Sequence, residues 1–356
     1  MTLTETLFDA LKTYLPHTPL HSEKGPFVVN DTTGIGLMIA GLFHEKKNNY
    51  AIVANNLYSA QRIYEFLLNF FPEEEVVFFP VDELLRAEAI SSSRDLLSQR
   101  LYAMGQLLSD GNKILVTHPA GLLRYLPSPS FFKESIIHLK KGDKIDLEKL
   151  KFQLSQLGYK HVNKIDQSLE FASRGDILDV FSVTSLSPYR IEFFDDEIES
   201  IRMFDIATQN SVKEVDSLTI LPASDTILSD EQITKFVARA TAQLSQEESS
   251  LNPSNADLLH TNVMNDIDDI VARNEKPSLY KYYSYALEEA HSILEYFNPV
   301  DIFISSKDDF NDSYHRLREE FGAYFSELEK DNRILKGLTH YMSMDEALPK
   351  KSLVSY

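Results

Sequence analysis

Residues 27–79 read FVVNDTTGIGLMIAGLFHEKKNNYAIVANNLYSAQRIYEFLLNFFPEEEVVFF, and this stretch decides the fold class. The two segments between its apolar runs have helical patterns, the first over about Ile35–Phe43 after a turn at Thr32–Gly34, the second over Ser59–Phe71. Continuous apolar strands that alternate with helices are typical of a parallel sheet covered on both faces. We therefore predict an α/β domain whose first strands are the three apolar runs, Phe27–Asn30, Ala51–Ala54 and Val76–Phe79.

The same pattern extends to both sides of this stretch. Upstream, leucines at helical spacing predict a helix over roughly Leu3–Tyr14. Downstream, the sequence predicts a helix near Arg94–Leu108, capped from within Ser91–Ser93, and then a further strand over Ile114–Thr117. The first part of the α/β domain is therefore expected to cover residues 1–127.

The pattern changes after Pro127 and Pro129. Beyond them, an Asp-Asp pair between two strand-like runs signals a hairpin turn at Asp195–Glu197. We predict a small α+β domain over residues 128–222, inserted into the α/β domain, which residues 223–356 complete. Its predicted helix and strands are Leu147–Leu157, Ile177–Phe181, Tyr189–Phe194 and Ile198–Phe204.

The C-terminal part returns to helical patterns. Ser229 is expected to cap a helix, Gln243–Asp257 is interpreted as an exposed loop, and Val300–Ile304 predicts a buried strand. Lys330–Tyr356 shows no clear closing element, which suggests a piece of a longer protein.

Composition excludes several classes of function. The 356 residues include 35 Lys and Arg against 54 Asp and Glu, a formal net charge of −19, so binding to DNA, RNA or anionic lipid is disfavoured as the main role. There is no cysteine, which excludes disulfides, thiolate metal sites and cysteine nucleophiles. His17 and His21 have Pro19 between them and cannot share a helix face, so no metal site is predicted. Without an apolar leader or a run of about 20 apolar residues, the chain is expected to be cytoplasmic and to have no membrane contact.

Residues 33–38 occupy the place where a nucleoside triphosphatase carries its phosphate-binding loop. Such a loop needs a Lys to reach the phosphates and a Ser or Thr to hold Mg²⁺. Gly34 and Gly36 are present, but those two places hold Leu37 and Met38, which cannot compensate phosphate charge. A helix that simply begins after a glycine turn explains the segment equally well. Both interpretations predict no ATP binding, no cofactor and no catalytic residue.

Several longer stretches point to a known family. Residues 33–38, 52–80 and 90–104 resemble domain 1 of UvrB, the damage-loading helicase subunit of bacterial nucleotide excision repair. The resemblance implies a helicase-like (RecA-like) fold for the parallel-sheet domain. It continues in FASRGDILDVF (171–181), PYRIEFFDDEIESIRMFD (188–205), ILPA (220–223) and ILEYFNPVDIFISS (293–306).

The sequence departs from UvrB in three places. The phosphate-loop Lys and Thr are replaced by Leu37 and Met38. After the strand VDIFI, Ser305 and Ser306 stand where an Asp-Glu pair is expected, and neutral hydroxyls cannot hold Mg²⁺ as carboxylates do. The aromatic hairpin with which UvrB clamps DNA has no room here, because the chain reaches Pro127 within a few residues of the corresponding strand.

A degenerate UvrB-like module of this kind is similar to the N-terminal UvrB-homology module of the bacterial transcription-repair coupling factor (Mfd). By implication, the rest of such a protein would carry the polymerase-binding domain and the DNA translocase. RNA polymerase and DNA would then be contacted only through parts outside this sequence.

The resemblance also implies a partner. In both families the inserted domain binds UvrA, and the family's contact residues carry over to Arg174, Arg190 and Phe194. The residues agree with this, because strand alternation places Phe193 on one face and Arg190, Glu192 and Phe194 on the other. An aromatic ring beside Arg is typical of a protein–protein contact. The alternative is local: Arg190 pairs with Glu192 or with an acid on a neighbouring strand, and Phe194 packs across the hairpin.

Two hypotheses about function remain. The first is a non-catalytic adaptor that recruits UvrA to stalled RNA polymerase complexes. The alternative is an active ATP-dependent DNA-remodelling helicase subunit of the UvrB type, with an unorthodox phosphate site. Measurements of ATP binding and hydrolysis separate the two.

Overall fold

A computed structural model describes residues 32–82, 93–183, 185–274, 276–299, 301–348 and 353–355. The helix predicted over Leu3–Tyr14 and the strand predicted over Phe27–Asn30 lie outside these residues.

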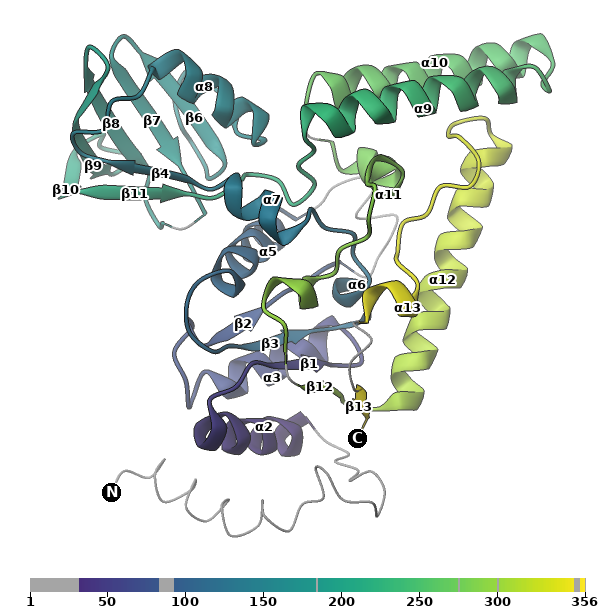
Figure 1. The fold of residues 1–356 in the computed structure, drawn as a ribbon, viewed down its shortest axis with the longest axis horizontal. Helices are drawn as coiled ribbons and strands as arrows, with labels where there is room; N and C mark the ends of the chain where they lie inside the picture. Colours follow the sequence, from purple (N-terminus) through teal and green to yellow (C-terminus); the bar gives the residue numbers. More distant parts are fainter. Residues whose placement is uncertain are drawn as a thin grey trace.

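Five parallel strands form the central sheet, in the order β13-β12-β1-β3-β2 (Figure 1). The middle strand β1 is buried at every position, and its residues alternate between two apolar cores. Tyr50 and Ile52 pack with helices on one face, whereas Ala51 and Val53 pack into the larger core on the other. A parallel sheet covered on both faces, and with it a mixed α/β fold, is therefore confirmed. The strands are β1 Tyr50–Val53, β2 Val76–Phe78, β3 Ile114–Thr117, β12 Asp301–Ile304 and β13 Leu353–Ser355.

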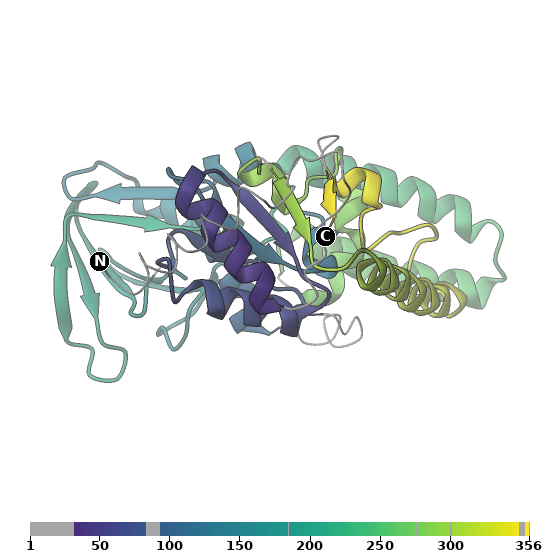
Figure 2. The same ribbon diagram turned by 90° about the horizontal axis from the view of Figure 1, so that it is seen from below.

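Helices close both faces of this sheet. Figure 2 shows α2 running across the strands on the face seen from below. The side chain of Ser93 accepts a hydrogen bond from the Leu96 amide and caps α5, as predicted. The expected turn at Thr32–Gly34 is wrong, because α2 begins at Thr32 and its glycines lie inside the helix. The helices here are α2 Thr32–Lys46, α3 Leu57–Leu67, α5 Arg94–Leu107 and α6 Pro119–Leu122.

Between α6 and α9 the chain forms a second unit around a six-stranded sheet, in the order β10-β9-β8-β7-β6-β5. Its neighbouring strands are antiparallel, apart from the short parallel pair of β5 and β6. Helix α8 packs on one face through Leu150 and Leu154, which share a core with Leu178 and Ile191. The elements are α7 Pro129–Glu134, β4 Ile137–Lys140, α8 Leu147–Gln156, β5 Lys160–His161, β6 Glu170–Arg174, β7 Ile177–Phe181, β8 Tyr189–Phe194, β9 Glu197–Phe204, β10 Ser211–Val215 and β11 Ser217–Ile220, which pairs with β4.

The remaining chain is mainly helical, and the six-stranded sheet and the α9–α10 hairpin lie at opposite ends of the molecule (Figures 1 and 2). The loop expected over Gln243–Asp257 is wrong: α9 continues to Glu248, and α10 begins at Pro253 after the cap residue Asn252. The expectation that Lys330–Tyr356 lacks a closing element is also wrong, because this segment holds α13 and the edge strand β13. The elements are α9 Asp230–Glu248, α10 Pro253–Val271, η2 Pro277–Tyr282, α11 Tyr283–Ala286, η3 Ile293–Tyr296, α12 Lys307–Lys330 and α13 Met344–Ala347.

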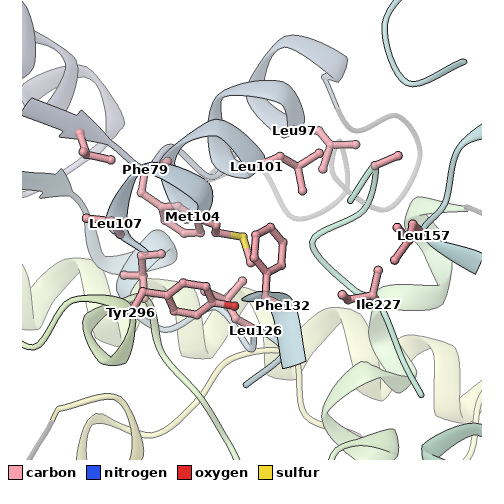
Figure 3. Packing of buried hydrophobic residues seen from close by; sticks show 14 of the residues in the cluster. Phe79, Leu97, Leu101, Met104, Leu107, Leu126, Phe132, Leu157, Ile227 and Tyr296 are labelled. Carbon is pink, nitrogen blue, oxygen red and sulfur yellow. The ribbon is translucent and has the colours of Figure 1, made fainter. Parts of the chain in front are cut away.

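One apolar core joins the two sheets. Figure 3 shows Met104 of α5 beside Phe132 of α7, and the ring of Phe132 meets that of Tyr296 edge-on at 5.9 Å between centroids. Leu157, from the end of α8, and Ile227, from the segment that leaves the six-stranded unit, belong to the same cluster. Because interiors are close-packed, this shared core restricts movement of the six-stranded unit against the parallel sheet.

A buried ion cluster reinforces this joint. The carboxylate of Asp225 accepts hydrogen bonds from Nε of Arg100 at 2.6 Å and from Nε of Arg124 at 2.9 Å. All three side chains are almost completely buried. Burial alone would raise the pKa of Asp225, but the two guanidinium groups outweigh burial and hold the pKa well below its usual 3.8. Asp225 therefore ties the segment returning from the six-stranded unit to α5 and to the end of α6.

Candidate functional site

Strand β8 separates a buried face from an open one. Ile191 and Phe193 point into the core, with 0% and 5% of their surfaces exposed. Phe194, the next residue, is 76% exposed. The predicted alternation is therefore present, and the ring of Phe194 is not packed away across the hairpin. An apolar ring left in water at the end of a strand is a feature that a partner can bury.

The turn after Phe194 has a defined conformation. Asp195 adopts a left-handed backbone with φ of 58°, which Asp tolerates better than most residues with a Cβ. The carbonyl of Asp196 accepts a hydrogen bond from the Ile145 amide at 2.7 Å, which attaches the turn to the segment before α8. The position of Phe194 is thus held on both sides of the turn.

Arg174 lies at the same end of the sheet. It is the last residue of β6 and is followed by Gly175, whose φ of +59° allows the tight turn into β7. The Phe193 amide donates to the carbonyl of Asp176 at 2.9 Å, which links this turn to the end of β8. Arg174 is exposed, and within the described part of the chain its guanidinium has no hydrogen-bond or ion-pair partner.

Strand register defines a surface that we call the outer face, the side of the six-stranded sheet opposite α8. Directly paired residues share a face, so the pairs Arg174↔Ile177, Ile177↔Glu192 and Glu192↔Ser200 form one row across four strands. A second row runs parallel to it, through the pairs Ala172↔Asp179, Asp179↔Arg190 and Arg190↔Arg202. Phe194 follows Glu192 by two residues on the same face.

Arg190 is engaged inside the chain. Its Nε donates to Oδ1 of Asp179 at 2.8 Å, and a terminal nitrogen donates to Oδ2 at 2.8 Å. The other contacts are a hydrogen bond to Oε1 of Gln209 at 3.3 Å and the buried ring of Phe204, 4.6 Å from the guanidinium carbon. The hydrogen bonds that Arg190 donates to Asp179 raise the pKa of Arg190 against the opposing effect of burial. The local alternative weighed for Arg190, an acid on a neighbouring strand, is therefore the arrangement observed.

Glu192 is also paired within the sheet. Its carboxylate forms an ion pair with Arg202 and accepts a hydrogen bond from the Ser200 hydroxyl at 2.9 Å. The outer face thus holds two matched ion pairs, Asp179–Arg190 and Glu192–Arg202. Of the three predicted contact residues, Arg174 and Phe194 are exposed and open to a partner. Arg190 forms an ion pair with Asp179 in the second row of the outer face.

The glycines of the expected phosphate loop lie in a helix. Gly34, Gly36, Leu37 and Met38 all belong to α2, and Met38 is buried. A Cβ at Gly36 would stand 2.5 Å from Cδ1 of Phe66, so a larger residue there would have to displace the Phe66 ring between α2 and α3. The geometry gives Gly36 a packing role.

The two serines at the edge of the parallel sheet are likewise held by internal contacts. Ser305 donates its hydroxyl to Oδ1 of Asn55 at 2.5 Å, and Ser306 caps α12 by accepting from the Asp309 amide at 3.2 Å. The amide nitrogen of Asn55 donates to a carboxylate oxygen of Asp309 at 2.9 Å. Both serines and Asn55 are therefore engaged by other groups of the chain.

Two kinds of feature are absent from the described residues. No group of three His, Asp or Glu side chains there has a geometry suited to a metal ion. No helix among these residues combines the length and apolar character that a bilayer crossing requires.

Sequence reasoning missed Asp179, Gln209 and Ile177 as parts of this surface. Asp179 is the third residue of a strand that was predicted correctly, and its partner Arg190 was singled out. What was missing was the register between β7 and β8, which the two predicted strands do not fix by themselves. Gln209 lies in the connection between β9 and β10, where the prediction placed no contact.

Comparison with known proteins gives a consistent result. Residues 137–225 match the sequence model of a family described as the UvrB interaction domain. Transcription-repair-coupling factors are similar over much of the chain: the Bacillus subtilis protein is 28% identical over 324 residues, covering 89% of this chain and 27% of that protein. The Haemophilus influenzae protein is 32% identical over 203 residues, which are 57% of this chain and 18% of that protein. The Staphylococcus aureus RF122 protein is 32% identical over 196 residues, which are 55% of this chain and 17% of that protein.

The chain therefore spans about a quarter, or less, of the length of the curated relatives it matches. The family match covers the whole six-stranded sheet and the segment up to Asp225. The resemblance predicted from the sequence, to the N-terminal UvrB-homology module of the transcription-repair coupling factor, is thus confirmed.

Proposed function

We propose that this chain is a non-catalytic adaptor of transcription-coupled nucleotide excision repair, and that its six-stranded unit binds UvrA. The observation that carries the proposal is Phe194, an aromatic side chain that is 76% exposed at a turn held in place on both sides. Arg174 stands at the same end of the sheet without an acid of its own in the described part of the chain. Aromatic and Arg side chains dominate the energetics of protein–protein contacts.

The match to a UvrB interaction domain supports this choice of surface, because the matched residues include both exposed groups. The names of the similar proteins support transcription-coupled repair as the setting. Contacts to RNA polymerase and DNA would belong to other parts of a longer protein, since the chain corresponds to 27% of the Bacillus subtilis relative.

The proposal also assigns no catalysis to this chain and describes the parallel-sheet domain as a degenerate helicase-like fold. Two features support it. Leu37 and Met38 replace the Lys and Thr of a phosphate loop, and α2 continues through both positions. Ser305 and Ser306, in place of an acidic pair, are used for a side-chain contact and a helix cap.

A pull-down of purified UvrA by the chain tests the proposal directly. We expect the unchanged chain to retain UvrA, and Phe194→Ala and Arg174→Ala variants to lose at least about 2 kcal/mol of binding free energy each if they are hot spots. Thermal unfolding of each variant serves as the folding control. Retention of UvrA by both variants would move the binding site elsewhere, and micromolar ATP binding or DNA-stimulated hydrolysis would contradict the non-catalytic assignment.

A further inference from the structure

A cleft of about 860 Å³ lies between α10 and the C-terminal part of α12. It is at the end of the molecule opposite the six-stranded sheet (Figure 1). One wall is a face of α10, and the other is formed by Tyr324 and Leu328 of α12 together with the segment that follows this helix. The cleft shares no residue with the outer face, so the proposed UvrA site does not account for it.

Helix α10 uses one face for packing and presents another to the cleft. Its apolar stripe is buried in the core of the helical region. The neighbouring face lines the cleft, and its residues recur at intervals of three and four, as residues on one side of a helix do. They are Asn255, Leu258, Asn262 and Asn265. Leu258 is 47% exposed in this wall, so an apolar side chain is left that a partner can cover.

The amide side chains on this face have unused hydrogen-bonding capacity. Asn262 donates one hydrogen bond, from its side-chain nitrogen to the carbonyl of Asn332 at 3.2 Å. Within the described part of the chain, the side-chain amides of Asn255 and Asn265 form no hydrogen bond. An amide side chain offers an acceptor and two donors, so it can pair with both polar groups of a peptide unit. From Asn255 to Asn265 the helix rises about 15 Å, the length of four or five extended residues.

Two acids in the cleft are already paired within the chain. Asp266 forms an ion pair with Lys281 at 2.6 Å, and each of these side chains is less than one-fifth exposed. Asp269 forms an ion pair with Lys276. Neither acid therefore needs a cation from an occupant of the cleft.

The end of the cleft beside α12 carries unpaired positive charge. Lys330 is the last residue of α12, Arg333 follows three residues later, and both are exposed. No described residue forms a hydrogen bond or an ion pair with either cation. Asp331 is the single acid between them, so two cations face one acid here, in a chain whose formal net charge is −19. An occupant gains from placing a carboxylate at this end.

We propose that this cleft binds an extended peptide segment of another protein, one that combines an apolar residue with acidic residues. The apolar residue covers Leu258, the amides of α10 pair with the peptide backbone, and an acid pairs with Lys330 or Arg333. A nucleic acid fits this cleft less well, because its phosphates would lie against the three acids in the walls. The inference goes beyond the proposed function and does not depend on it.

Fluorescence anisotropy with the whole chain tests the proposal. The probe is a fluorescein-labelled hexapeptide that contains one leucine and two glutamates. We expect saturable binding with a Kd of about 100 μM, since a short flexible segment loses conformational freedom when it binds. A peptide with serine in place of the leucine, and another with lysines in place of the glutamates, should each bind about tenfold more weakly.

Matched variants of the chain test the location of the site. Leu258→Ser should lower the affinity for the acidic peptide about tenfold. Val271→Ser is its control and should leave the affinity unchanged, because Val271 is 52% exposed at the end of α10 but does not line the cleft.

A second pair of variants tests the charge. Arg333→Glu should weaken binding of the acidic peptide about tenfold and should bind the lysine peptide more tightly than the unchanged chain does. Arg318→Glu makes the same change of charge on α12 outside the cleft, and it should alter either affinity by less than about twofold. Circular dichroism of every variant confirms that binding is compared among folded chains.

Three results would overturn the inference. The first is no saturable binding of the acidic peptide up to about 1 mM. The second is an equal loss of affinity in a cleft variant and its control. The third is self-association of the chain in sedimentation velocity that Leu258→Ser abolishes, because the occupant would then be a second copy. Retention of UvrA is measured separately in the pull-down and should be unchanged in Leu258→Ser, so failure of this inference is distinguishable from failure of the proposed function.

Discussion

The edge of the parallel sheet and the outer face of the six-stranded sheet are both rich in polar groups, but they use them differently. At the parallel-sheet edge, Ser305, Asn55 and Asp309 hydrogen-bond to one another, and Ser306 caps a helix. At the outer face, the ion pairs leave Arg174 and the ring of Phe194 exposed. The named side chains of the first region bond to other groups of the chain, whereas the second region keeps two side chains available. Availability of this kind, more than polarity, marks a surface that can bind a partner.

The largest expected effect concerns the joint between the two regions. Asp225→Asn removes the only carboxylate shown between Arg100 and Arg124 in the described part of the chain, and we expect it to lower the free energy of unfolding by about 3–5 kcal/mol. Urea denaturation followed by circular dichroism measures this change. Asp196→Asn, at an exposed turn, is the control and should change stability by less than about 0.5 kcal/mol. Equal effects of the two changes would contradict a structural role for the buried cluster.

The same cluster predicts a dependence on pH. The pKa of Asp225 is lowered in the folded chain, so its contribution to stability is fully present above the unfolded-state value of about 3.8. That contribution is lost as the pH falls from there toward the lower folded-state pKa. Unfolding midpoints measured from pH 6 down to pH 3 should therefore decline less steeply in Asp225→Asn than in the unchanged chain. Parallel curves would show that this carboxylate does not contribute to the acid sensitivity.

Phe193 and Phe194 are adjacent, but one is buried and the other exposed, so their substitutions should affect different properties. Phe193→Ala, in the core, should lower the free energy of unfolding by about 3–5 kcal/mol. Phe194→Ala should leave stability nearly unchanged and lower the free energy of UvrA binding by about 2 kcal/mol. Chemical denaturation and calorimetric binding, run on both variants, separate the two effects. A large loss of stability in Phe194→Ala would mean that its ring supports the fold.

A smaller effect is expected at the parallel-sheet edge. Ser306→Ala removes the cap of α12 and should lower the free energy of unfolding by about 1 kcal/mol, measured by thermal denaturation. Its affinity for UvrA should be unchanged, because the cap belongs to the other region. A loss of UvrA binding in this variant would show that the two regions are coupled.

For nucleotide addition we expect no effect on stability. Addition of millimolar ATP with Mg²⁺ should leave the thermal unfolding midpoint unchanged, because a ligand raises the midpoint only if it binds the folded chain. The reason is local: α2 runs through the loop positions, and Phe66 fills the space beside Gly36. A rise of several degrees would restore a nucleotide-binding role to this edge.

Local patterns in the sequence predicted much of the fold, and long-range pairing explains what they missed. The alternation of β8 was predictable, because Ile191 and Phe193 are apolar at every second position. The helix α12 was not predicted, since its buried residues Phe310, Leu317 and Phe325 are sparse along a charged segment. The predicted loop over Gln243–Asp257 is too long, because only four residues separate the end of α9 from Pro253, the first residue of α10.

In the candidate site, too, local features were predictable and contacts between strands or helices were not. The exposure of Phe194 follows from its position in the strand and was predictable. The bidentate contact of Arg190 with Asp179 depends on register, so the sequence could only offer an acid on a neighbouring strand as one of two alternatives. The packing of Gly36 against Phe66 joins two helices whose contact no local pattern reveals.

The order in which the strands are synthesised differs between the two sheets. All strands of the six-stranded sheet lie within residues 160–215, so this unit can pair its strands while the ribosome is still making the helices that follow. The parallel sheet cannot do so, because β1 requires β12 as its neighbour, and the hydrogen-bonded pair Asn55 and Ser305 is 250 positions apart. Contacts of such separation form slowly. During translation, the outer face should therefore form first, while the central sheet is still incomplete.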